Sequence, residues 1–344
     1  MGTPRRYARG AFSLWRKGIL RVGRSLRQFL ELAFEVRTSV EQFGAAPSLP
    51  QHLPLLTSHF FTVDVEEYFQ VKALESVVHR DEWLSRPSRV AKSIDALLDL
   101  LANHSVRGTF FVLGWLAEHR PEVVLSIAAA GHEIASHGFW HERVTALDAN
   151  TFREDVRSSK RVLEDLTGTA VLGYRAPNFS IVPGCEWAFD TLIEQGYAYD
   201  SSLFPFRRRG YGYPGAPRSP HIIQRGHGRI AEFPLATTSI LGYPVPAAGG
   251  GYLRHLPLAL VQRAFREATA RSEPATFYIH PWETDFHQPR LSVSRLNRVR
   301  HYRGLDSTLG RMERILEEFT FGTIASYLPH IGGPDKTVSS LGAA

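Results

Sequence analysis

Cysteine is almost absent from this chain of 344 residues, and long apolar runs are absent altogether. The single cysteine, Cys185, excludes an intramolecular disulfide, so the fold does not depend on an oxidising compartment. No apolar run is long enough to cross a bilayer, and no apolar core followed by a small-residue cleavage site marks a signal peptide. We therefore expect a cytoplasmic protein, at most associated with the inner face of the membrane.

Most of the chain also lacks surplus basic charge. The formal net charge is +6, and residues 1–50 account for all of it with nine Lys/Arg and three Glu. Neutralising the phosphates of a nucleic acid requires a basic surplus on the folded body, and this body has none. We therefore expect no nucleic-acid partner.

The basic charge belongs to an N-terminal segment with helical periodicity. Over residues 5–36, apolar side chains recur at steps of three and four, and arginines and a lysine lie between them. This pattern predicts an amphipathic helix, which either lies on an anionic membrane surface or docks on the protein body. We assign residues 1–50 to this segment and its linker, 51–330 to the main domain and 331–344 to a disordered tail.

The main domain alternates short β-rich runs with longer stretches of helical period. This alternation predicts an α/β fold, either a barrel or a doubly wound sheet. The predicted strands span 59–65, 108–114, 132–136, 171–174, 198–203, 230–235 and 276–280. The predicted helices span 89–103, 122–130, 148–166, 186–195, 256–270 and 305–318.

Residues 206–229 form a long connection with six arginines and no acidic residue. Such a length is unusual for a connection without structure of its own. We consider two interpretations, a solvated basic loop and a lid or groove that meets an anionic group.

Polar residues follow several of the predicted strands. The first strand runs into Asp64 and Glu66, which alternation places on the same side. Carboxylates at the end of a buried strand are costly unless they bind a cation or pair with a base. The third strand is followed by His137 and His141, which face one ion if the backbone turns helically after the strand. Two histidines and a carboxylate with open positions are typical of a catalytic metal site.

Two further strands end in polar residues, Arg175 and His280. In parallel β/α folds, the carboxyl ends of the strands form the edge where active sites assemble. The strand ends together supply the side chains that metal-assisted amide hydrolysis needs: a base, an acid and metal ligands.

These segments resemble the polysaccharide deacetylase family, the carbohydrate esterases that include chitin and peptidoglycan deacetylases. Residues 62–69 (TVDVEEYF), 199–205 (YDSSLFP) and 280–283 (HPWE) resemble more closely the subgroup found with exopolysaccharide loci of the exosortase type. The resemblance covers residues 59–328. It implies a distorted (β/α) barrel of about seven parallel strands and one divalent ion, usually zinc, with cobalt or nickel as alternatives.

The resemblance also implies roles for individual residues. Many family members have adjacent aspartates where this chain reads Asp64-Val65-Glu66, so Glu67 competes with Glu66 as a ligand. By the same resemblance, Asp200 is a candidate partner of His280. Independently of the resemblance, the aromatic residues Tyr174 and Trp282 are candidates for packing against a sugar ring or against the core. The remaining roles are Asp64 as the base, Arg175 orienting it, His280 as the acid, and Glu66, His137 and His141 as the metal ligands.

The expected activity is hydrolysis of an N-acyl group, in particular N-acetyl, from an amino sugar of a polysaccharide or lipid-linked glycan in exopolysaccharide biosynthesis. Two alternatives remain open at this point. One is a hydrolase of small formamides or cyclic amides, and the other is an inactive carbohydrate-binding homologue. Acyl release separates the enzymes from the binding module, and activity on small amides separates the two enzymes.

Overall fold

The computed structural model describes residues 58–208, 210–331 and 338–339. The amphipathic helix predicted over 5–36, and with it the predicted membrane contact, lies outside these residues. Within the described part of the chain, no helix combines the length and apolar character needed to span a bilayer.

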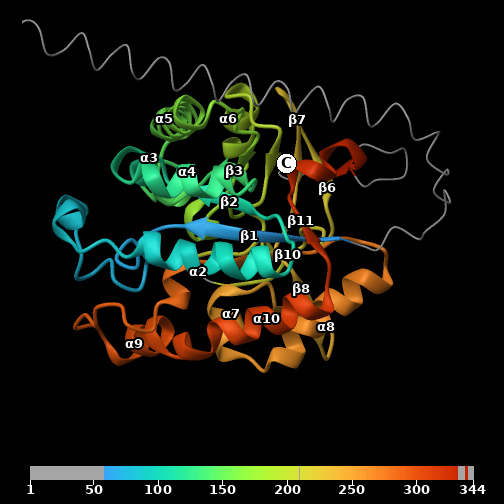
Figure 1. Cartoon of the computed structure of the whole chain (residues 1–344). Helices are drawn as coiled ribbons and strands as arrows, with labels where there is room; N and C mark the ends of the chain where they lie inside the picture. Colours follow the sequence, from blue (N-terminus) through green and yellow to red (C-terminus); the bar gives the residue numbers. More distant parts are fainter. Residues whose placement is uncertain (1–57, 209, 332–337, 340–344) are drawn as a thin grey trace, which may run out of the picture. The chain divides into compact units, whose positions relative to one another are not determined.

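Seven strands run parallel in the spatial order β10-β1-β2-β3-β4-β5-β7 (Figure 1). Beyond β7, the bridge between Leu235 and Thr276 of β10 is also parallel, so the two ends of this path meet. This arrangement confirms the predicted α/β barrel. The strands are β1 (His59–Val65), β2 (Thr109–Val112), β3 (Glu133–Ser136), β4 (Gly173–Tyr174), β5 (Tyr199–Asp200), β7 (Gly228–Glu232) and β10 (Thr276–Ile279).

Helices follow most of these strands and cover the outside of the sheet (Figure 1). The α helices are α2 (Val90–Asn103), α3 (Gly114–His119), α4 (Pro121–Ala129), α5 (Ala149–Thr167), α6 (Trp187–Glu194), α7 (Gly250–His255), α8 (Leu258–Ala270), α9 (Arg295–Tyr302) and α10 (Thr308–Glu318). Short 3-10 helices span Arg80–Ser85, Val144–Ala146, Pro177–Phe179, Pro281–Thr284, Leu305–Ser307 and Ala325–His330.

Helix α5 illustrates how local sequence sets these boundaries. Its N-cap, Asp148, accepts a hydrogen bond from the Thr151 amide at 2.8 Å, which satisfies one of the free donors of the first turn. Gly168 ends the helix with φ +67°, a left-handed conformation that glycine adopts without steric cost. Between the caps, Phe152 and Val156 belong to the buried face that packs on the core.

Alternation along the strands separates two apolar clusters. In β1, Phe61 and Val63 belong to the large cluster that includes the buried faces of the helices. Phe60 belongs to a smaller cluster inside the barrel, to which β2, β3, β5 and β7 also contribute. The inward residues that follow Phe60 along β1 are Thr62 and Asp64, both buried. The interior therefore changes from apolar to polar toward the carboxyl ends of the strands.

The structure adds elements that the sequence did not predict. Residues 206–229 contain β6 (His221–Arg225), which pairs antiparallel with β7, so this connection is partly a strand. The tail predicted as disordered contains β12 (Val338–Ser339), which pairs parallel with β6, because the edge of β6 offers backbone groups that need partners. Further additions are β11 (Phe321–Gly322) on β1, the hairpin of β8 (Thr237–Ile240) and β9 (Tyr243–Pro246), and the helices α3, α7 and α9.

Candidate metal and acid–base site

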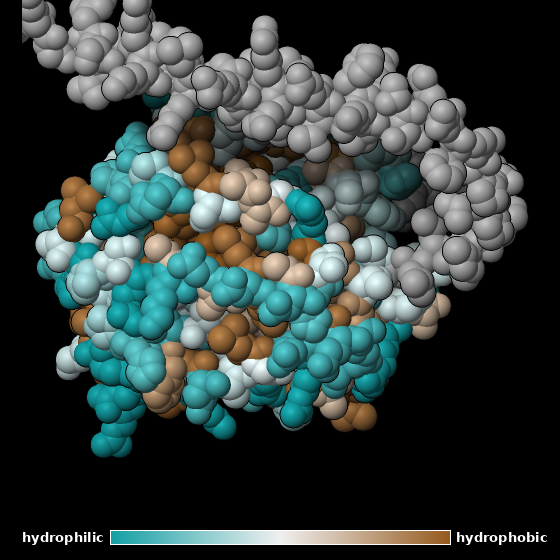
Figure 2. Space-filling view, in the orientation of Figure 1, coloured by the Kyte–Doolittle hydropathy of each residue, from teal (hydrophilic) through white to brown (hydrophobic). Residues whose placement is uncertain are grey.

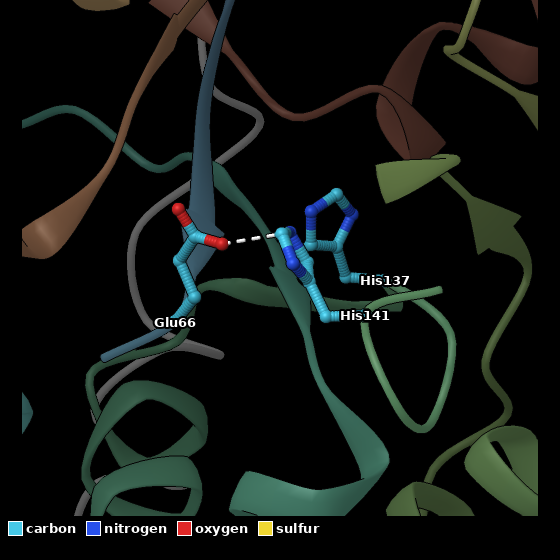
Figure 3. A group of neighbouring side chains, drawn as sticks. All are labelled: Glu66, His137 and His141. Carbon is cyan, nitrogen blue, oxygen red and sulfur yellow. Dashed lines mark ion pairs between the residues drawn. The ribbon is translucent and has the colours of Figure 1, made fainter. Parts of the chain in front are cut away.

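Three side chains meet at the carboxyl end of the barrel (Figure 3). Glu66 follows β1, His137 follows β3, and His141 lies in the loop after β3. One ligand atom from each of these residues lies within 4.8 Å of the other two, and the Glu66 Oε2 to His141 Nε2 distance is 2.8 Å. The two histidines that the sequence predicted to face one ion do lie together, although the local structure differs from the predicted helical turn.

The loop that carries the two histidines is not helical. Gly138 and His141 have φ values of +74° and +57°, so the chain reverses through left-handed conformations. Asp155 of α5 accepts hydrogen bonds from the amides of Phe139 at 2.8 Å and Trp140 at 3.1 Å. A Cβ atom on Gly138 would lie 2.8 Å from Asp155 Oδ2, so this close contact requires glycine. Sequence analysis missed Asp155, which has no motif of its own.

The donor set fits a divalent ion such as zinc. His137 Nδ1 lies 2.8 Å from the Arg175 carbonyl oxygen, which accepts its proton and leaves Nε2 free for an ion. Burial lowers the pKa of His137 to about 4, so its imidazole is neutral, as a ligand must be. Beyond its 2.8 Å ion-pair contact with His141 Nε2, the buried Glu66 Oε2 receives no hydrogen bond from the described residues. A buried carboxylate oxygen beside two imidazoles is what a cation would stabilise.

The charge of Glu66 is favoured despite its burial. Burial alone would raise its pKa, but His141 and His280 lower the pKa to about 2. Trp282 contributes a hydrogen bond from its Nε1 to Glu66 Oε1 at 3.0 Å. Its neighbour Glu67 is also buried but turns away, accepting hydrogen bonds from Ser88 Oγ and from the amide that precedes α2. The geometry therefore favours Glu66 over Glu67 as the carboxylate ligand.

Asp64 and Arg175 form a fully buried ion pair, with Arg175 Nη1 2.6 Å from Asp64 Oδ1. The same guanidinium donates to Thr62 Oγ1 at 2.7 Å and to the Ser201 carbonyl and hydroxyl at 2.9 and 2.7 Å. Its plane lies over the Phe111 ring, 4.0 Å from the centroid. These contacts fix the orientation of Arg175. Because Arg175 binds Asp64 Oδ1, the other oxygen, Oδ2, stays available on the side of His280.

His280 lies across the site from the two histidines and is held by a residue that sequence analysis passed over. Its Nδ1 is 2.6 Å from Glu283 Oε1, and Glu283 Oε2 is 2.5 Å from Arg254 Nε. Burial opposes a charge on His280, but Glu66 and Glu283 outweigh it and raise its pKa to about 9. Its Nε2 lies 3.6 Å from Glu66 Oε1 and 3.9 Å from Asp64 Oδ2.

Two other candidates lie outside this group. Asp200 is buried and accepts hydrogen bonds from the amide and hydroxyl of Ser202 at 2.9 and 2.7 Å. Among the described residues, the hydrogen-bond partner of His280 is Glu283 rather than Asp200. Tyr174 is 1% exposed and packs against the rings of Phe152 and Tyr197, so it does not offer a surface to a sugar.

The ligand cluster and the two acid–base candidates open on one cavity of about 160 Å³. Trp282 lies on its wall, so of the two aromatic candidates only Trp282 faces the site. The cavity is lined, among others, by Asp64, Glu66, His137, His141 and His280.

Two family models match adjacent parts of the chain. Residues 86–183, which contain His137, His141 and Arg175, match the polysaccharide deacetylase family. The resemblance to that family is confirmed. Residues 201–329, which contain Arg254, His280 and Glu283, match a domain of unknown function (DUF3473). The two candidate histidine ligands thus lie in the part that matches the deacetylase family, and the candidate acid lies in the part that matches the second domain.

Curated deacetylases are similar to part of the chain. The peptidoglycan-N-acetylglucosamine deacetylase of Bacillus cereus is 30% identical over 146 residues, which are 38% of this chain and 51% of that protein. The peptidoglycan deacetylase of Helicobacter pylori is 34% identical over 112 residues, which are 32% of this chain and 36% of that protein. The chain therefore spans between about a third and a half of these relatives.

A solved structure covers more of the fold. The crystal structure of a polysaccharide deacetylase homologue from Mycobacterium smegmatis superposes with a TM-score of 0.56 at 20% identity. It covers 86% of this chain and 98% of that one. At this identity the likeness supports the fold, and it agrees with the barrel described above.

Proposed function

We propose that this chain is a metal-dependent hydrolase that removes an N-acyl group, in particular N-acetyl, from an amino sugar. The observation that carries the proposal is the convergence of Glu66, His137 and His141 on the same cavity as Asp64 and His280. A carboxylate and a histidine beside a metal ligand set are what amide hydrolysis requires.

Glu66, His137 and His141 would hold the ion, for which zinc fits the nitrogen-rich donor set and cobalt or nickel are alternatives. A bound divalent ion lowers the pKa of a water molecule toward 7 and polarises an amide carbonyl. Asp64 Oδ2 takes a proton from the attacking water, while Arg175 holds the other carboxylate oxygen.

His280 Nε2 donates a proton to the leaving amine, which departs poorly as an anion. Glu283 keeps this imidazole charged and oriented, because its carboxylate accepts the Nδ1 hydrogen. The backbone N–H of Asn178 is suited to bind the developing oxyanion. Asn178 lines the cavity, whereas the amides of Arg175, Ala176 and Phe179 donate within the protein.

The substrate class follows from the relatives and from the resemblance. The similar proteins are named as deacetylases of peptidoglycan, and others as chitooligosaccharide deacetylases. We propose a polysaccharide or lipid-linked glycan in exopolysaccharide biosynthesis as the substrate of this chain. Membrane contact through residues 5–36 and a place at the inner face of the membrane remain predictions of the sequence.

Metal content tests the proposal without a guess about the substrate. We expect about one zinc ion per chain in the purified protein, loss of the ion in His141→Ala, and retention in His227→Ala. His227 is a matched control because its side chain is 62% exposed and lies outside the cluster. Wild type should then release acetate from chitotetraose, and Asp64→Asn should not. A wild-type protein that binds no zinc, cobalt or nickel would overturn the proposal.

A further inference from the structure

A second and larger cavity adjoins the candidate site. Its volume is about 730 Å³, which is within the range of cavities that bind small molecules. Asn178, Phe179 and His280 line both this cavity and the smaller one at the ligand cluster. A ligand can therefore occupy the larger cavity and reach Asp64 and His280 at the same time.

The charged side chains that line the larger cavity are mostly basic. Lys72, Arg143, Arg208 and Arg300 face one carboxylate, that of Glu75. Glu75 forms an ion pair with Lys72 and lies 3.9 Å from Arg143, so its charge is already shared. These five side chains thus leave a surplus of three positive charges, without counting His280.

Of these four cations, Arg208 and Arg300 have no acidic partner among the described residues. Arg208 donates to the Tyr252 hydroxyl at 3.0 Å, and its guanidinium lies 5.1 Å from the centre of the Tyr211 ring. These contacts orient the guanidinium but do not neutralise it. Arg300 is an exposed residue near the end of α9.

The chain segment that contains Arg300 is itself basic. Residues 286–305 contain five arginines and no acidic residue. The surface over α9, at the lower left of the space-filling view, is mostly hydrophilic (Figure 2). Like charges that line one cavity repel one another, so an anion bound between them would relieve this repulsion.

We propose that the larger cavity binds an anionic substituent of the substrate, a carboxylate or phosphate carried on or next to the N-acylated sugar. The guanidinium groups of Arg208 and Arg300 bind its oxygens, since a planar fork of N–H donors matches both anions. The inference rests on the proposed function and narrows it from neutral glycans to acidic or phosphate-linked ones.

Three N-acetylated monosaccharides test the proposal on the zinc-loaded full chain. They are N-acetylglucosamine, which is neutral, N-acetylmuramic acid, which carries a carboxylate, and N-acetylglucosamine 1-phosphate. Calorimetry gives the dissociation constant of each sugar. We expect at least one of the two anionic sugars to bind about tenfold tighter than the neutral one, and the one that does identifies the substituent.

Variants assign this preference to the cavity. Arg300→Gln and Arg208→Gln should each lower the anionic-to-neutral affinity ratio about tenfold. Arg298→Gln is the matched control, because Arg298 lies on the same helix and does not line the cavity. Equal affinity of wild type for all three sugars, or the same ratio in Arg300→Gln and Arg298→Gln, would overturn the proposal.

Acetate release from neutral chitotetraose and zinc content, measured on the same samples, separate this inference from the proposed function. Acetate release without an anionic preference overturns only the role of the cavity. Absence of both zinc and acetate release overturns the function itself, and the inference with it.

Discussion

Glu283 accepts a hydrogen bond from His280 at 2.6 Å and binds Arg254 with its other oxygen at 2.5 Å. A carboxylate whose pKa lies at about 2 only accepts hydrogen bonds, so Nδ1 of His280 carries the proton. The ring therefore presents Nε2 to the cavity between Asp64 and Glu66. The candidate acid owes its orientation to a residue three positions later in the chain.

Glu283→Gln tests this relationship. We expect kcat for acetate release to fall about 10- to 100-fold. Glutamine is neutral and has an NH2 group in place of one carboxylate oxygen, so it no longer compensates the positive charges of Arg254 and His280. KM and zinc content should stay within about twofold of wild type, which a general structural defect would not allow. Glu313→Gln, an exposed change on α10, is the control. Unchanged kcat in Glu283→Gln would contradict a positioning role.

Asp155→Asn tests how the histidine loop is held. Asparagine replaces one carboxylate oxygen by an NH2 donor, so either the Phe139 or the Trp140 amide loses its acceptor and faces another donor. We expect zinc affinity to fall about tenfold in a competition titration with a chelator. Glu154→Gln, at the neighbouring exposed position, should keep wild-type affinity. Equal affinity in both variants would show that the loop does not depend on Asp155.

Arg175→Lys keeps the positive charge but removes the planar guanidinium group and its several N–H donors. The lysine cannot reach Thr62, Asp64 and Ser201 together, which leaves buried acceptors unsatisfied. We expect the free energy of unfolding, measured in urea, to fall by about 3 kcal/mol, and acetate release to be lost with it. Arg161→Lys on the exposed side of α5 should change neither quantity. A stable, active Arg175→Lys protein would refute the assigned role.

Glu232 and Asp200 give a pH dependence of stability. Burial and the neighbouring Asp200 carboxylate raise the pKa of Glu232 well above its usual range. The folded protein therefore holds a proton that the unfolded chain releases above pH 4.5 or so, and stability falls as the pH rises from there toward the folded-state pKa.

Glu232→Gln removes this titration, since the amide resembles the protonated acid. Between pH 5 and 7, wild type should lose more free energy of unfolding than Glu232→Gln, by at most about 1.4 kcal/mol per pH unit. The exposed change Glu317→Gln should follow wild type. Parallel curves for wild type and Glu232→Gln would show that Glu232 is ionised in the fold.

Metal removal should lower thermal stability, because an ion that binds the folded state alone stabilises it. With free zinc at about 100 times its dissociation constant, we expect a stabilisation of about 2.7 kcal/mol, which corresponds to an increase in Tm on the order of 5 °C. His141→Ala should show no such increase, and a shift of equal size in that variant would place the ion elsewhere.

Short-range pattern predicted much of the fold and the candidate site. The bounds of β1 agree residue by residue with the strand predicted at 59–65, where Phe and Val residues favour a buried strand. Asp64, Glu66, Arg175 and His280 were singled out because each lies at or just after the end of a buried strand, where a polar group is costly unless it is paired or bound. A parallel sheet gathers such strand ends at one edge, so the sequence by itself indicated which residues would meet.

Only the tertiary structure decided between competing candidate residues. Glu66 rather than Glu67 joins the histidines, since Glu67 is used at the start of α2. Glu283 rather than Asp200 holds His280, and Asp155 positions the histidine loop from a helix of its own. These choices depend on how side chains from distant segments pack and pair, and hydrogen bonds between distant segments leave no periodicity in a sequence.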